Sequence, residues 1–246
     1  MTPWPPPAVP PERLAVKGIS VPIVIGVWAA SWLIGNLLGA AALLISGHLE
    51  TDPIHMPTWA VAVSTVALWV PALLALGLVS RARGTGSWSS DFGLRARWSD
   101  LLGVPIGVAS QLLLVPLVTF PFTRLFPDTF SAERIEERAR SLADMASGPW
   151  IVLLALVVVG GAPLVEELTY RGFIQFGVAK RIGEPASVLV TAAWFTLVHL
   201  SWPEFPGLFA FALVLGACAA RTGRLGMAIA AHVAFNATGL VFVVLL

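Results

Sequence analysis

Long apolar runs separated by short polar segments organise the sequence. The first run begins at Gly18 and carries no charged residue until Glu50. A hydrocarbon core about 30 Å thick needs roughly 20 helical residues, and most of the runs reach that length. We therefore expect an all-α fold, a polytopic transmembrane helical bundle with about seven spans. The expected spans are residues 18–46, 57–80, 101–123, 150–178, 186–202, 207–220 and 225–246.

The runs predict one transmembrane domain over residues 18–246, preceded by a Pro-rich tail at residues 1–17. The fifth and sixth runs are short for a bilayer, so we expect residues of their loops to extend them. Two glycine pairs, Gly35/Gly39 and Gly103/Gly107, have the spacing that lets membrane helices approach closely. These pairs predict packing and carry no information about chemistry.

Composition agrees with a membrane protein and excludes other classes. Hydrophobic residues make up 57% of the 246 residues and charged residues only 12%, against about 25% charged residues in soluble domains. The net charge of +1 comes without a basic face or arm, so we expect no nucleic-acid partner. The single cysteine, Cys218, excludes an internal disulfide and a thiolate metal cage.

Positive charges in the loops predict the orientation. Lys and Arg precede the first span and return in segments 81–97, 180–181 and 221–224, whereas loop 47–56 has none. Under the positive-inside rule, this alternation places the N-terminus in the cytoplasm. Loop 124–149, with four arginines on the expected outer side, is the exception. We expect an integral protein of a bacterial cytoplasmic membrane.

Three ionisable residues lie inside the run at 150–178, namely Glu166, Glu167 and Arg171. Each costs about 2.5–3.5 kcal/mol at the centre of a membrane helix, so each needs a partner or a function. Glu167 and Arg171 form an i,i+4 pair in the favourable order, which predicts an ion pair. Glu166 has no such cation, and an isolated carboxylate in a low-dielectric site suits a general base or acid. A Gly-Gly pair and a proline at 160–163 predict a break in the helix nearby.

Later spans contribute two histidines and an asparagine. His199 ends the sequence Phe195-Thr-Leu-Val-His199, and His232 precedes Asn236 by one helical turn. Counting helical rise from the expected cytoplasmic ends places these side chains near the depth of Glu166. We therefore expect them to meet in one layer. The default alternative for a single buried His or Asn is a structural hydrogen bond between helices.

These residues form three motifs in order: Glu-Glu-x-x-x-Arg, Phe-x-x-x-His and His-x-x-x-Asn. Together they resemble the CAAX protease and bacteriocin-processing family, which includes the Rce1-type prenyl-protein endopeptidases. The resemblance covers residues 150–246, with no substitution in the motifs. It implies an intramembrane endopeptidase in which Glu166 activates the attacking water with assistance from His199. It further implies two pairs, His232 with Asn236 to polarise the carbonyl and stabilise the oxyanion, and Glu167 with Arg171 to support the site.

The metal requirement stays open from the residues alone. Glu166, His199 and His232 would make a three-ligand zinc site with an open position. The sequence His-Glu-x-x-His is absent, and the resemblance implies a glutamate mechanism without metal. We expect no cofactor, with zinc as the alternative.

Two other functions remain as alternatives. A catalytically inert scaffold or immunity protein of the same family would keep the motifs without hydrolysis. An ion-coupled carrier would use the same Glu and His residues as a relay, although no internal repeat pairs two halves of the chain. The expected partners are the lipid bilayer and a membrane-associated peptide or protein substrate. The sequence indicates neither whether that substrate is lipidated nor the oligomeric state.

Overall fold

All regular structure in the described part of the chain is helical. The computed structural model describes residues 19–51, 56–131, 133–135, 140–141, 144 and 148–245, so the expected tail at 1–17 lies outside it. The α-helices are α1 (Val21–Ile45), α2 (Thr58–Arg83), α3 (Trp88–Asp91), α4 (Gly103–Ala109), α5 (Val115–Leu125), α6 (Pro127–Phe130), α8 (Trp150–Ala155), α9 (Ala162–Glu166), α10 (Phe176–Ile182), α11 (Glu184–Leu197), α12 (Phe205–Thr222) and α13 (Gly226–Leu245). A 3₁₀-helix η3 (Trp98–Leu102) and three π-helical stretches, η4 (Ser110–Leu114), η5 (Leu156–Gly161) and η6 (Glu167–Gln175), join some of them.

The expected all-α membrane bundle is confirmed. Among the described residues, six continuous helical segments are long and apolar enough to cross a bilayer. The expected fifth span corresponds to α11, whose 14 residues are about 21 Å long and end at Leu197. The six segments are 21–45, 58–83, 98–125, 150–182, 205–222 and 226–244.

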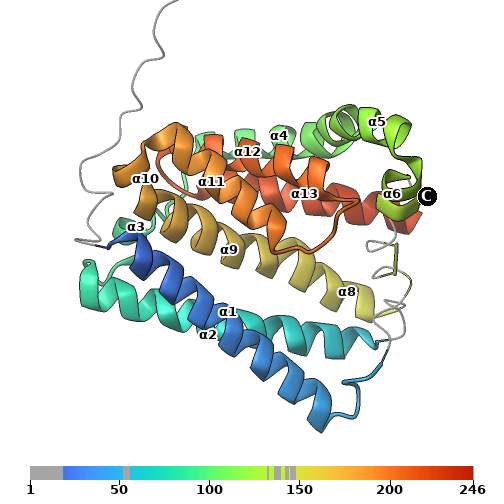
Figure 1. The fold of residues 1–246 in the computed structure, drawn as a ribbon, viewed down its shortest axis with the longest axis horizontal. Coiled ribbons are helices and arrows are strands. Elements are labelled where there is room, and N and C mark those ends of the chain that lie inside the picture. Colours follow the sequence, from blue (N-terminus) through green and yellow to red (C-terminus); the bar gives the residue numbers. More distant parts are fainter. Residues whose placement is uncertain are drawn as a thin grey trace, which may run out of the picture.

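The segment 150–182, made of α8, η5, α9, η6 and α10, lies in the middle of the bundle (Figure 1). The antiparallel hairpin of α1 and α2 packs along one side of it, and α11, α12 and α13 lie on the other side with α4 and α5. The central position explains why η6 is buried along its whole length, whereas α1 and α2 expose most of their side chains. Glu167 and Arg171 of the central segment are therefore shielded from lipid by neighbouring helices.

Glycines set the closest helix contacts. A Cβ at Gly35 would lie 2.8 Å from the Cα of Leu68 in α2, and one at Gly107 would overlap the carbonyl oxygen of Ala231 in α13. Both expected glycine pairs are therefore at helix interfaces, α1 against α2 and α4 against α13. The contact of α4 with α13 matters for the site because α13 carries His232 and Asn236.

Three π-helical stretches interrupt the spans. The sequence predicts a break at 160–163, and the structure has η5 there, followed by only five α-helical residues before η6. A π-turn widens the helix and rotates the side chains that follow it, and such turns are frequent at functional sites. Adjacent helical residues point about 100° apart, so Glu166 at the end of α9 and Glu167 at the start of η6 face different surroundings.

A polar segment between α2 and η3 ties the ends of several helices together. The buried carboxylate of Asp91 accepts hydrogen bonds from the hydroxyls of Ser80 and Thr85 and from the backbone N–H of Thr85. Burial raises the pKa of Asp91, but these hydrogen bonds outweigh it, so the pKa lies below its ordinary value. Nearby, Asp100 forms an ion pair with Arg224 at the start of α13. This segment fixes the start of α13 relative to α2.

The glycine contacts predict a stability difference between two Gly→Ala variants. Gly107→Ala should lower the free energy of unfolding by about 1–3 kcal/mol, because its Cβ overlaps the Ala231 carbonyl and pushes α4 from α13. Gly26→Ala in α1 is the control, since nothing lies within 4 Å of the added methyl group. Thermal unfolding in detergent measures both. A Gly107→Ala protein as stable as Gly26→Ala would contradict the close packing.

Candidate active site

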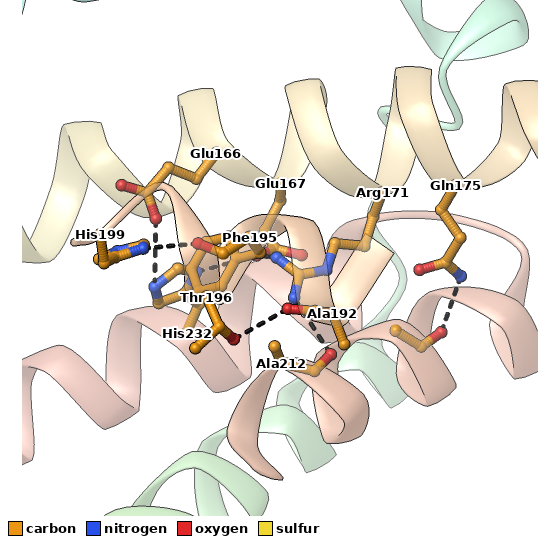
Figure 2. A network of polar contacts seen from close by, with 11 residues as sticks. Glu166, Glu167, Arg171, Gln175, Ala192, Phe195, Thr196, His199, Ala212 and His232 are labelled. Atoms are coloured by element: carbon orange, nitrogen blue, oxygen red, sulfur yellow. Dashed lines mark hydrogen bonds and ion pairs between the residues drawn. The ribbon is translucent and has the colours of Figure 1, made fainter. Parts of the chain in front are cut away.

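A buried ion pair forms the centre of the polar network in Figure 2. Nη1 of Arg171 lies 2.8 Å from Oε1 of Glu167, and both side chains are almost completely buried. Nη2 of Arg171 donates to the backbone carbonyl of Ala212 in α12, and the guanidinium lies 4.7 Å from the ring centroid of Phe195 in α11. The expected i,i+4 pair is therefore present, and it connects the central segment to two neighbouring helices.

His232 joins this network from α13. Its Nδ1 lies 2.9 Å from the same Oε1 of Glu167. Because a carboxylate can only accept, Nδ1 carries the hydrogen, and Nε2 accepts in the neutral imidazole or donates in the imidazolium. That Nε2 lies 3.7 Å from Oε2 of Glu166. Glu167 thus fixes the tautomer of His232 and turns its other nitrogen toward Glu166.

Glu166 differs from its neighbour Glu167 in exposure and in partners. Its side chain is 26% exposed, whereas that of Glu167 is 0% exposed. Figure 2 shows Glu166 beside His199 and His232, at the end of a row of polar side chains that continues through Glu167 and Arg171. Its contact with His232 is longer than a hydrogen bond. The carboxylate is therefore the more accessible of the two acids, as expected for a group that reacts.

His199 lies just beyond the end of α11, within the turn that leads to α12. Its Nδ1 lies 2.7 Å from the carbonyl oxygen of Phe195, one turn earlier. A carbonyl can only accept, so Nδ1 carries the hydrogen. The ring of Phe195 lies between the two histidines, with its centroid 4.6 Å from that of His199 and 6.0 Å from that of His232.

Glu166, His199, His232 and Asn236 all line one cavity of about 410 Å³. Asn236 also donates from Nδ2 to the carbonyl of Val158 in η5, at 2.8 Å, which uses one of its two N–H groups. Hydrophobic side chains cover most of the remaining wall. These hydrophobic lining residues include Val61, Val115, Leu154, Val157, Leu208, Phe211, Phe235 and Leu240. The structure thus brings the four expected catalytic residues to one space inside the bundle.

Two glutamines belong to this region and are absent from the sequence-based interpretation. Nε2 of Gln175, one turn beyond Arg171, donates to the carbonyl of Gly216, parallel to the Arg171–Ala212 contact one turn earlier. Gln111 lines the cavity from η4. The signal that could have found them is a neutral amide inside an apolar span, which needs a partner as a charge does.

Residues 148–238 match the family model described as type II CAAX prenyl endopeptidase Rce1-like. This C-terminal region is similar to the Rce1-like family. The matched residues include all six polar residues of the motifs, from Glu166 to Asn236. No curated protein and no solved structure matches the chain significantly. The Rce1-like family is one of proteases, so the match supports a peptidase at the level of the family.

Among the residues that the structure describes, no group of three or more His, Cys, Asp and Glu side chains is close enough together to hold a metal ion. No step of the chemistry below is therefore routed through a metal.

The buried pair predicts a large stability effect. Arg171→Met leaves the carboxylate of Glu167 buried without its cation, so unfolding should become easier by about 3–5 kcal/mol. The double variant Glu167→Gln, Arg171→Met removes both charges and should recover part of that loss. Thermal unfolding of the three proteins in one detergent checks this order. A single variant as stable as the double one would contradict a charged Glu167.

Proposed function

We propose that the protein is an intramembrane endopeptidase that hydrolyses a peptide bond with a water activated by Glu166. The observation that carries the proposal is the difference in exposure and partners between the adjacent acids Glu166 and Glu167. Glu167 is fully buried and bonded to Arg171 and His232, whereas Glu166 is partly exposed to the cavity and has no close cation. The Rce1-like family supplies the reaction class.

In the proposed reaction a water lies between Glu166 and the scissile carbonyl. Glu166 takes a proton as the water oxygen attacks the carbonyl carbon, with Nε2 of His199 as a second acceptor beside it. The carbonyl oxygen becomes an oxyanion. Hydrogen-bond donors stabilise this negative charge most strongly in a site that excludes water. Collapse of the tetrahedral intermediate breaks the C–N bond, and the proton passes from Glu166 to the leaving amine.

Two residues of α13 are suited to the oxyanion. Asn236 retains one N–H after its bond to Val158, and protonated His232 would donate from Nε2. Arg171 acts through Glu167, because it neutralises the carboxylate that orients His232. These three residues therefore position or stabilise charge, and Glu166 moves the proton.

The cavity favours a substrate presented from the membrane. It lies within the bundle of spanning helices, and its wall is mostly apolar. A membrane-associated peptide, with or without a lipid, fits this space better than a soluble polar one. We propose the cytoplasmic membrane of a bacterium as its location, with the N-terminus inside, on the loop charges alone.

An inert scaffold and an ion-coupled carrier are the competing functions. A scaffold does not need an accessible Glu166, and a carrier needs a route across the bilayer. The peptide-sized cavity beside an accessible acid favours hydrolysis over both.

Glu166→Gln should abolish cleavage of a quenched lipopeptide panel by the purified protein, by at least about 100-fold, as for loss of a general base. The fold should survive, because Glu166 makes no hydrogen bond that holds two helices together. Glu184→Gln is the matched control, since it makes the same chemical change outside the cavity. Equal cleavage by wild type and Glu166→Gln would refute the assignment of the base. The scaffold would be favoured if neither protein cleaved any peptide of the panel and the biological phenotype survived Glu166→Gln.

Chelation tests the metal alternative. Activity should persist after prolonged treatment with EDTA and 1,10-phenanthroline, and the active protein should contain no stoichiometric zinc, because no group of three or more His, Cys, Asp and Glu side chains among the described residues could hold a metal ion. Metal content by mass spectrometry and activity after dialysis give the two readouts. Loss of activity that added zinc restores would replace the glutamate mechanism by a metal site.

A further inference from the structure

Gln111 is the unusual polar residue of the span Trp98–Leu125. The hydroxyls beside it in sequence are satisfied by their own helix: Ser110 donates to the carbonyl of Ile106, and Thr119 to that of Val115. Gln111 has a larger polar group than either and makes no hydrogen bond within the part of the chain that the structure describes. Its carboxamide is half-buried and lines the cavity.

The other neutral polar residues of the cavity wall do have partners. Thr65 donates to the carbonyl of Val61, Asn236 to that of Val158 and Thr119 to that of Val115. The carboxamide of Gln111 therefore keeps both its donor and its acceptor available to a molecule in the cavity.

Gln111 lies against the backbone of α13 at Gly239. The three end atoms of its side chain, Nε2, Cδ and Oε1, lie 3.5–3.8 Å from the position that a Cβ of Gly239 would occupy. Gly239 follows Asn236 by three residues, and both line the cavity. The carboxamide is thus about one helical turn, or roughly 4.5 Å along α13, beyond Asn236.

We infer that Gln111 binds the peptide backbone of the substrate on one side of the scissile bond, an inference that rests on the proposed peptidase function. A carboxamide offers both a donor and an acceptor, the pair that one backbone amide and one carbonyl of an extended peptide require. An extended chain advances about 3.3 Å per residue, so a group 4.5 Å beyond Asn236 meets the peptide one or two residues from the reacting carbonyl. The glycine at 239 leaves room for the peptide beside the carboxamide.

The specificity that follows is for an extended backbone rather than for one side chain. The wall beside Gln111 is formed by Val115, Leu240 and Phe235, which would contact side chains without selecting a charged group. The peptide segment that binds there is apolar and extended over at least three residues.

Binding measured without cleavage tests the inference. In the Glu166→Gln background, a fluorescent N-acylated heptapeptide of Ala and Leu is titrated by anisotropy, together with six analogues that each replace one amide by an ester. One ester position should weaken binding about 3- to 10-fold, the effect of one lost hydrogen bond. Gln111→Leu should weaken the parent peptide by a similar factor, and the same ester should then cost nothing more. Leu113→Ala, which faces away from the protein, is the control.

The outcomes separate this inference from the proposed function. Any of three results would overturn the inference. The ester effects could be identical with and without Gln111, the affinity could be unchanged in Gln111→Leu, or neither protein could bind the peptide saturably. In the otherwise wild-type protein, Gln111→Leu should raise KM for a cleaved lipopeptide with little change in kcat. Cleavage that depends on Glu166 and ignores Gln111 would leave the peptidase intact and remove only the inference. Binding that depends on Gln111 without any cleavage would remove only the peptidase.

Discussion

The structure depends on keeping one arginine inside an apolar bundle. Arg171 is completely buried, and such a charge is tolerated only with a counter-ion and several hydrogen bonds. Glu167 supplies the charge, the carbonyl of Ala212 accepts from the second nitrogen, and the ring of Phe195 covers the guanidinium. Since these partners come from three helices, the same contacts that neutralise the charge also fix how the helices meet.

The two adjacent acids at this ion pair, Glu167 and Glu166, differ in their partners. Glu167 has one cation and a histidine on the same oxygen, so His232 is held in one tautomer and at one angle. Glu166, one residue earlier, lies at the edge of the network and keeps its carboxylate for the cavity. One acid is thus accessible while its neighbour is completely buried, because adjacent residues of a helix point about 100° apart.

The sequence was sufficient for the membrane bundle and for the identity of the polar residues, because both follow from rare charges in long apolar runs. Glu167–Arg171 could be paired from spacing alone, since helical neighbours four residues apart meet. The contact of His232 with Glu167 could not, because it joins residues 65 positions apart through tertiary packing. The partners of Asn236 and Gln175 are backbone carbonyls, which no residue pattern distinguishes. The length of α11 could not be predicted from the sequence either, because the helix ends at the turn that positions His199.

The cavity draws its walls from the whole chain, whereas the Rce1-like match ends at residue 238 and begins at 148. Val61, Thr65, Gln111 and Val115 lie before the match, and Gly239 and Leu240 after it. The proposed reacting groups all lie within the match, whereas part of the enclosing surface is encoded outside it. Mutations in the first half of the chain can reshape what the cavity accepts while the polar network stays intact. Related proteins that differ in substrate range are then expected to differ mainly before residue 148, in the stretch that the family match does not cover.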